Sequence, residues 1–306
     1  MKPKIWQNGS IVSWEDATIH ASSECVLKGS NVFEGIRAYW SDDSSQLNVF
    51  RMEEHLDRLF DVSMRFLRMQ SPYSRDEIAD GIIQLLAINE FRENVHIRPV
   101  VYFDDGPDYA VTLEEISVGA FILALPRRNN PQLQAGISSI VSPWRRMSDT
   151  SQPSRIKAGA NYLNARVAAV DARQKGADLP ILLNEFGRVC EGPNACVFML
   201  RRGELVTPSV NEGILESVTR ATVLELARDR IGVAPIERSI EVSELYSCDE
   251  LFFAGTGAEL LPIVELDRYQ IGHGKPGPLT RSLQDAYFAV VHGKDARYEA
   301  WLSPVF

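Results

Sequence analysis

One stretch, residues 153–200, constrains this chain more than any other. It contains a lysine, Lys157, in the small-residue string KAGANY, and a helix-like run follows it. An apolar run from Leu179 to Leu183 then precedes a turn and an acid, Glu191, in the string CEGPNA. A lysine amine attacks an aldehyde only when it is partly desolvated or close to a cation. A single lysine is usually a solvated surface residue, so the prediction of a reactive amine depends on the whole stretch.

Composition excludes several classes of protein. The 306 residues allow one large or two ordinary domains, and the net charge of −9 argues against binding to nucleic acid. No apolar signal core or run of eighteen apolar residues is present. The histidines form no H-x-x-x-H pair, which predicts no metal site. The cysteines form no C-x-x-C pair and fit a reducing compartment; they are Cys25, Cys190, Cys196 and Cys248. We therefore expect a cytoplasmic enzyme with small-molecule substrates and no membrane or nucleic-acid partner.

The first part of the chain is predicted to be a small α+β unit. Asn8-Gly9 lies between apolar residues, which is typical of a β-hairpin. Apolar residues at helical spacing predict one helix around residues 56–67 and another around 78–86. Further strands are predicted at 36–40, 47–50, 95–103 and 117–125. A polar, proline-terminated segment at 127–131 then indicates a linker.

The second part is predicted to be rich in strands with a few helices. Strands are expected at 137–141, 179–183, 189–190, 196–200 and 250–254. Helices are expected after Tyr162, near Ser217, and from Leu279 to Val291. The domain prediction is therefore a small domain at 1–126, a linker at 127–136 and a larger domain at 137–306.

Several strings together resemble the branched-chain amino acid aminotransferases, which are class IV, fold-type IV enzymes that use pyridoxal 5′-phosphate. They are KAGANY, CEGPNA, HLDRL, SVTR, GTGAE, GSNVFEGIR and HIRP, and the resemblance runs nearly end to end. It implies an α/β (α+β) fold with a small N-terminal domain and a larger C-terminal domain that has a β-barrel-like core. It also implies a homodimer or higher homo-oligomer whose active site borrows residues from a second subunit.

The resemblance assigns the cofactor-binding residues. Lys157 matches the catalytic lysine that holds the cofactor aldehyde, Glu191 the partner of the pyridine nitrogen, and Tyr162 the partner of the ring hydroxyl. The phosphate is expected at the start of a helix, where backbone N–H groups and the helix dipole favour an anion. The expected phosphate-binding residues are Arg58, Ser217, Val218, Thr219 and Thr256.

The expected substrate-binding residues are Phe33, Lys28, His96, Arg98, Gly257 and Ala258. Arg98 matches an arginine that recognises the distal carboxylate of glutamate. Lys28 and His96 replace tyrosines that are usual in the family, and Arg127 lies in LPRR where the family often has an aromatic-rich string. A pocket for leucine or valine side chains should be mostly apolar. These replacements therefore predict an amino donor or acceptor with an additional polar or acidic group.

Other functions remain open from the sequence. A lyase of the same fold, resembling aminodeoxychorismate lyase, would eliminate pyruvate, and an amine transaminase would act on substrates without an α-carboxylate. A non-catalytic relative is disfavoured by the presence of Lys157, Glu191, Tyr162 and Arg58. A separate G-x-G-x-x-G match at 272–277 is predicted to be a surface loop, because prolines follow it where a dinucleotide fold needs a helix.

Overall fold

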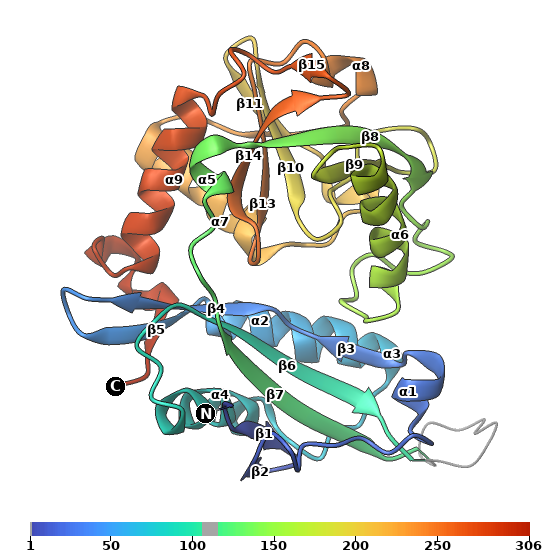
Figure 1. Cartoon of the computed structure of the whole chain (residues 1–306), viewed down its shortest axis with the longest axis vertical. Helices are drawn as coiled ribbons and strands as arrows, with labels where there is room; N and C mark the ends of the chain where they lie inside the picture. Colours follow the sequence, from blue (N-terminus) through green and yellow to red (C-terminus); the bar gives the residue numbers. More distant parts are fainter. Residues whose placement is uncertain (1, 106–115) are drawn as a thin grey trace. The chain divides into compact units, whose positions relative to one another are not determined.

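The computed structural model describes residues 2–105 and 116–306 (Figure 1). The chain forms two compact units. Unit 1 comprises Met1–Arg128, Ile156–Ala160 and Val290–Phe306, and unit 2 comprises Asn129–Arg155 and Asn161–Ala289. The units are therefore not consecutive in sequence, because the short segment around Lys157 and the C-terminal segment belong with the N-terminal part.

Unit 1 is built on an eight-stranded sheet in the order β16-β5-β4-β6-β7-β1-β2, with β3 paired to β6. Its strands are β1 Ile5–Gln7, β2 Ser10–Val12, β3 Asn31–Phe33, β4 Ile36–Ser41, β5 Gln46–Phe50, β6 Val95–Phe103, β7 Val118–Pro126 and β16 Leu302–Pro304. Its helices are α1 Glu24–Lys28, α2 Met52–Asp57, η1 Arg58–Met64, α3 Arg65–Leu67, α4 Arg75–Ile88 and η5 Ala296–Trp301. The long antiparallel pair β6 and β7, and the predicted strands around them, are confirmed.

Local sequence explains how unit 1 begins. Asn8 and Gly9 both have positive φ, 47° and 84°, as the tight turn of a two-residue hairpin requires. α4 starts at a capping box in which Ser74 and Glu77 satisfy each other's backbone N–H groups. Gly81 of α4 faces Trp6, because a Cβ there would lie 3.0 Å from the indole Nε1. The helix therefore packs closely on the sheet through its apolar face.

The helix predicted around residues 56–67 is continuous, but its middle is not α-helical. α2, η1 and α3 follow one another without a break, and η1 is a π-helix of seven residues, Arg58–Met64. Segments of π-helix are rare and are frequently found at functional sites. The hydrophobic spacing of the sequence predicted the helix and its buried face, but it does not distinguish the two hydrogen-bond patterns.

Unit 2 contains a second eight-stranded sheet in the order β12-β11-β10-β13-β14-β8-β9, with β15 paired to β14. Its strands are β8 Ile137–Arg145, β9 Leu179–Leu183, β10 Cys196–Arg201, β11 Glu204–Thr207, β12 Ile236–Glu237, β13 Glu250–Gly255, β14 Glu259–Leu266 and β15 Tyr269–Gln270. Isolated bridges join Leu183 to Val189 and Glu191 to Cys196. These bridges connect β9 back to β10, so the strands complete a barrel-like circuit, as expected.

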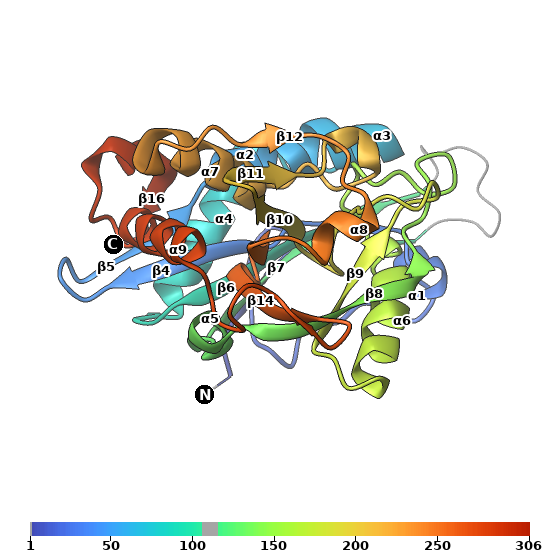
Figure 2. The same cartoon turned by 90° about the horizontal axis from the view of Figure 1, so that it is seen from above.

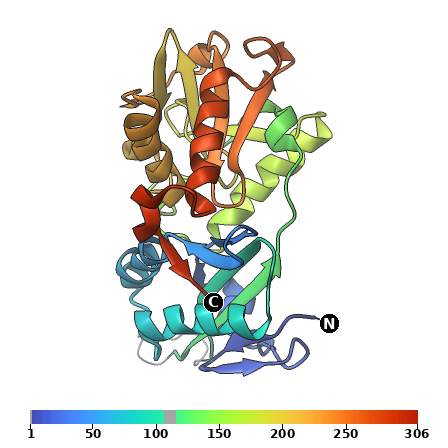
Figure 3. The same ribbon diagram turned by 90° about the vertical axis from the view of Figure 1, so that its left-hand side faces the viewer.

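Helices cover the sheet of unit 2. They are α5 Gln132–Ala135, α6 Asn161–Gln174, η3 Val210–Glu212, α7 Val218–Leu226, η4 Ala227–Ile231, α8 Val242–Leu245 and α9 Pro278–Val291, whose last two residues belong to unit 1. α6 lies against β8 and β9 (Figure 2). The red helix α9 passes along the strands in Figure 3, and the Glu250 carboxylate accepts the N–H groups of Leu279 and Thr280 at its start. The helix begins at Pro278, and proline is well tolerated in a first helical turn.

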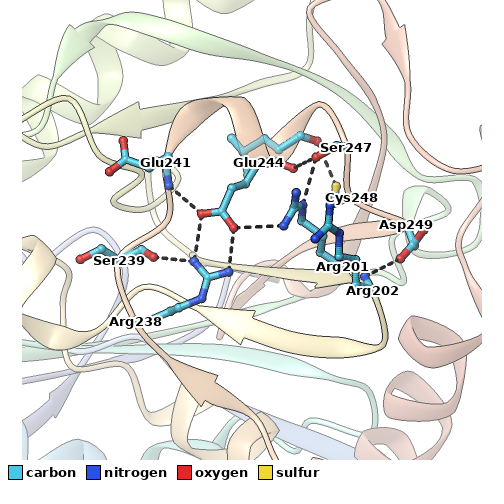
Figure 4. Close-up of polar contacts among 10 residues, drawn as sticks. Arg201, Arg202, Arg238, Ser239, Glu241, Glu244, Ser247, Cys248 and Asp249 are labelled. Atoms are coloured by element: carbon cyan, nitrogen blue, oxygen red, sulfur yellow. Dashed lines mark hydrogen bonds and ion pairs between the residues drawn. The ribbon is translucent and has the colours of Figure 1, made fainter.

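A polar cluster fastens α8 to the strands of unit 2 (Figure 4). Arg238 donates two hydrogen bonds to the Glu244 carboxylate, at 2.9 and 2.7 Å, and Glu241 donates its N–H to the same carboxylate. Arg201 donates to Ser247 Oγ at 3.0 Å. The hydrogen bond with Arg238 holds the pKa of Glu244 below its ordinary value, although burial opposes this. This bidentate pair is a structural contact that involves no predicted site residue.

Candidate functional site

The backbone of Lys157 is fixed on both sides within unit 1. Its N–H donates to the buried Ser63 Oγ at 3.0 Å, and its carbonyl accepts the N–H of Phe33 at 3.0 Å. A bridge pairs Ala158 with Val32 of β3. The Lys157 Nζ lies 5.1 Å from the centroid of the Phe33 ring. The amine is therefore held over an aromatic face, as a cation–π contact requires.

The small residues after Lys157 have a steric cause. A Cβ on Gly159 would lie 2.4 Å from Asn31 Oδ1, and the Gly159 N–H donates to the Asn31 carbonyl at 3.0 Å. A side chain at position 159 would collide with the side chain of Asn31. The glycine of the KAGANY string therefore lets the lysine segment approach β3.

Arg58, predicted to bind phosphate, lies in a buried ion pair. Its Nε and Nη2 each donate to the Glu34 carboxylate at 2.7 Å. His55 Nδ1 lies 2.7 Å from Glu34 Oε2. Glu34 is fully buried, and His55 and Arg58 are 2% and 7% exposed. His55 thus contacts Glu34, which in turn holds one edge of the guanidinium.

Basic groups gather around the residues of unit 1 that were predicted to bind substrate. Arg98 lies over Phe33, 5.0 Å from its centroid to the guanidinium carbon, and Arg37 of β4 is the direct cross-strand partner of His96 on β6. Burial, followed by the charges of Arg98, Arg37, Arg127 and Lys157, lowers the pKa of His96 to about 3. His96 is therefore neutral near pH 7, and the predicted residues Phe33, His96 and Arg98 are brought together with Lys157.

Lys28 is placed differently from the other predicted substrate-binding residues. It is the last residue of α1 and pairs with Glu24 at 3.3 Å, one helical turn earlier. Its side chain is 59% exposed. An exposed i,i+4 pair of this kind contributes little to stability.

In unit 2, Glu191 occupies the seam that completes the barrel-like circuit. Its Oε1 accepts from Arg146 Nε at 2.7 Å, and its Oε2 accepts the N–H of Leu215 at 3.2 Å. The carboxylate is buried, and each oxygen retains a further lone pair for another donor. Burial lowers the pKa of Arg146. The charge of Glu191, together with smaller contributions that include Tyr162 on α6, outweighs burial, so the net pKa is raised. Glu191, Arg146 and Tyr162 therefore form one electrostatic group.

The start of α7 and the β13–β14 turn come together in unit 2. Ser217 caps α7 by accepting the N–H of Arg220 at 3.2 Å. Val218 and Thr219 occupy the first turn, where backbone N–H groups have no acceptor within the helix. Thr219 Oγ1 lies 3.4 Å from Thr256 Oγ1. Two hydroxyls and a helix N-terminus thus lie together, which is an arrangement suited to an anion.

The turn after β13 supplies the remaining predicted residues. A Cβ on Gly255 would lie 2.9 Å from Ala195 Cβ, so this turn packs against the loop that follows Glu191. Among the residues that the structure describes, none has an atom within 4 Å of a Cβ built on Gly257, and Ala258 is half-buried beside it. Gly257 therefore borders open space, whereas Gly255 fills a tight contact.

Sequence reasoning missed four residues of these groups: Glu34, His55, Ser63 and Arg146. Glu34 and His55 lie inside two strings that resemble the family, GSNVFEGIR and HLDRL, but only their neighbours Phe33 and Arg58 were predicted to be site residues. The roles of Glu34 and His55 depend on burial and on contacts between distant parts of the chain. For Ser63 and Arg146 the sequence carries no local signal.

Among the described residues, no helix is long and apolar enough to cross a membrane. The same part of the chain contains no group of three or more His, Cys, Asp or Glu residues arranged to hold a metal ion.

Comparison with known proteins places the chain in a family. Residues 31–266 match the family described as "Amino-transferase class IV". A protein of Aquifex aeolicus named "Probable branched-chain-amino-acid aminotransferase" is 41% identical over 300 residues, which covers 97% of this chain and 95% of that protein.

Solved structures agree with this relationship. The branched-chain amino acid aminotransferase of Thermobaculum terrenum in its PLP form is similar with a TM-score of 0.94 and 39% identity, covering 99% of this chain and 98% of that one. The branched-chain aminotransferase of Thermoproteus uzoniensis, solved with norvaline, has a TM-score of 0.92 and 37% identity, covering 99% of each chain. The chain therefore belongs to the class IV aminotransferases, within the branched-chain amino acid aminotransferase family.

Proposed function

We propose that this protein uses pyridoxal 5′-phosphate to move an amino group between an amino acid and a 2-oxo acid. The observation that carries the proposal is the lysine, Lys157, whose backbone is fixed by Ser63 and Phe33 and whose amine lies over the Phe33 ring. A cofactor aldehyde requires a lysine amine, and these contacts fix the segment that carries it.

Side chains within each unit suit chemical groups of this cofactor. A buried carboxylate, Glu191, suits a protonated pyridine nitrogen, and Tyr162 suits the ring hydroxyl. Ser217, Val218, Thr219 and Thr256 offer backbone and hydroxyl donors to a phosphate, and Arg58 offers a positive charge. We assign these residues to the cofactor.

When bound, the cofactor supplies an aldehyde for the amino group and a ring that withdraws electrons from the substrate α-carbon. Lys157 Nζ would hold the cofactor aldehyde and, once free, would take the proton from the substrate α-carbon as a general base. Arg146 holds the Glu191 carboxylate in place through its 2.7 Å hydrogen bond. The amino donor leaves as a 2-oxo acid before the acceptor enters, which gives ping-pong kinetics.

Incubation of the purified protein with one amino donor and one 2-oxo acid tests this function. A new amino acid and a new 2-oxo acid in equal amounts support it, and Lys157→Ala should abolish their formation. Release of pyruvate without any acceptor would favour a lyase instead. Turnover of amines that lack an α-carboxylate would favour an amine transaminase.

We further propose that the preferred substrate carries a second acidic or polar group. The support is the cluster of cationic groups around the neutral His96, formed by Arg37, Arg98 and Arg127 with Lys157 nearby, in which Arg98 lies over Phe33. The guanidinium groups of Arg98 and Arg127 form no ion pair with another residue of 2–105 or 116–306. A carboxylate of the substrate is the natural counter-charge for such a cluster.

A panel of amino donors tests the substrate class directly. Dicarboxylic donors should give a higher kcat/KM than leucine or valine, and Arg98→Gln should reduce this preference. Leucine as the best donor would contradict the proposed acidic substrate without affecting the aminotransferase function.

We propose in addition a homodimer, or a larger homo-oligomer, that acts in the cytoplasm. The exposed position of Lys28 at the end of α1 supports a role for this residue in the active site of a second subunit rather than in its own. Sedimentation at several protein concentrations tests the oligomeric state.

A further inference from the structure

Unit 1 contains a cluster of buried polar side chains, two of which are charged, and removing these charges from water costs free energy. Glu34 lies directly after β3 and is fully buried, Arg58 begins η1, and His55 lies in α2. Burying a carboxylate and a guanidinium is costly, and replacing such a pair with apolar side chains often leaves stability unchanged or higher. Stability alone is therefore a weak reason for this cluster.

The charge states in the cluster follow from its contacts. Burial raises the pKa of Glu34, but Arg58 and the hydrogen bond from His55 outweigh burial and hold the pKa well below its ordinary value. Burial, the largest cause, lowers the pKa of His55. The hydrogen bond and charge of Glu34 oppose this, the charges of Arg58 and Lys157 act with burial, and the net pKa is lowered. His55 is therefore neutral with its proton on Nδ1, and this N–H donates to the ionised Glu34.

The cluster is part of a closed circuit that includes Lys157. Phe33 donates its N–H to the Lys157 carbonyl, and the next residue, Glu34, holds Arg58. η1 then runs from Arg58 to Ser63, whose hydroxyl accepts the N–H of Lys157 at 3.0 Å. Each link is a hydrogen bond or a covalent connection, so the spacing between the Lys157 segment and the Arg58 guanidinium is fixed.

We propose that Glu34 and His55 are positioning residues that aim Arg58 at the phosphate of the cofactor, at a set distance from Lys157. This inference depends on the proposed function, in which Lys157 holds the aldehyde end and Arg58 binds the phosphate end. Glu34 takes the Nε–H and one Nη2–H of Arg58, which fixes the plane of the guanidinium. His55 in turn fixes the carboxylate, as outer partners of a bound group commonly do.

His55 offers the most specific test, because its replacement leaves both charges of the ion pair in place. His55→Leu has a similar volume and removes the donor to Glu34, whereas the Nδ2 of His55→Asn can occupy the place of Nδ1. The full-length protein, freed of cofactor, is titrated with pyridoxal 5′-phosphate and with pyridoxal, which lacks the phosphate. The measured quantity is the dissociation constant of pyridoxal divided by that of pyridoxal 5′-phosphate.

We expect His55→Leu to weaken binding of pyridoxal 5′-phosphate about tenfold or more, the usual effect of losing an outer partner. The affinity for pyridoxal should equal that of the unaltered protein, so the ratio falls. His55→Asn should bring the ratio most of the way back to that of the unaltered protein. Glu34→Gln should lower the ratio as well, because one N–H of Arg58 loses its acceptor.

The Arg238–Glu244 pair provides the matched control. It is a bidentate contact of the same kind, and it involves none of the residues assigned to the cofactor (Figure 4). Glu244→Gln should lower Tm slightly and leave the ratio of dissociation constants unchanged.

The outcomes separate the two claims. Equal losses of affinity for pyridoxal 5′-phosphate and pyridoxal in the Glu34 and His55 variants, or no loss at all, would overturn the positioning role. An unaltered protein that binds neither compound would overturn the proposed function itself.

Discussion

At the scale of single residues, burial decides which ionisable side chains keep their ordinary charge. His96 is only partly exposed and lies among four cationic groups, so its folded-state pKa is lowered to about 3 from 6.5. Above pH 6.5 both the folded and the unfolded protein hold a neutral imidazole. Below it, only the unfolded protein gains the proton, and this stabilises the unfolded state.

Replacement of His96 should therefore flatten the acid side of the stability profile. His96→Gln removes a group that disfavours folding progressively as the pH falls from 6.5 towards 3. Between about pH 6.5 and pH 5 we expect the unaltered protein to lose about 1 kcal/mol more than the variant, allowing for solvent screening. Urea unfolding at both pH values measures this difference. Parallel losses in the two proteins would contradict the lowered pKa of His96.

Glu191 should be important for stability as well as for chemistry. Glu191→Gln leaves the Arg146 guanidinium without its charged partner. The side chains of Glu191 and Arg146 are 8% and 10% exposed, so water replaces the lost partner poorly. Removal of one partner from a buried pair costs about 3 kcal/mol or more. A double-mutant cycle with Arg146→Met measures the coupling, and additive effects would show that the two side chains act independently.

At the scale of elements, turns and a π-helix bring the predicted residues to their places. The seam at Val189–Glu191 joins β9 to β10 and so fixes Glu191, and η1 carries Arg58 at one end and Ser63 towards the other. Periodicity and turn residues predicted most strands and helices, because these depend on local hydrophobic spacing. Strands β3, β11, β12, β14, β15 and β16 were not predicted. Most of them are very short, and β3, β12 and β16 pair with strands that are distant in sequence.

The turn after Glu191 allows a prediction at this scale. A Cβ on Gly192 would lie 2.6 Å from a ring carbon of Phe253 in β13, whereas a Cβ on Gly257 has open space. Gly192→Ala should therefore destabilise the protein by about 1 to 3 kcal/mol, the usual cost of overpacking. Gly257→Ala is the control and should leave Tm nearly unchanged. Equal Tm values for the two variants would show that Phe253 moves aside freely.

At the scale of the whole molecule, the family and the chemistry were predicted from the strings around Lys157 and Glu191, and the comparisons confirm both. The supporting contacts were not predictable. Glu34 meets Arg58 across 24 positions of sequence, and Arg146 meets Glu191 across 45. Such pairs depend on how strands are ordered in a sheet, and neither composition nor spacing reports that order. The return of Ile156–Ala160 to unit 1 has the same cause.

The most direct test of the central claim is the visible absorption spectrum of the full-length protein as single amino donors are added without any acceptor. We expect a yellow band from cofactor held on Lys157. When a suitable donor is added, this band should disappear as one equivalent of 2-oxo acid forms. Lys157→Ala should lack the lysine-dependent band while remaining folded. If the unaltered protein shows no such band after cofactor is added, the role assigned to Lys157 is wrong.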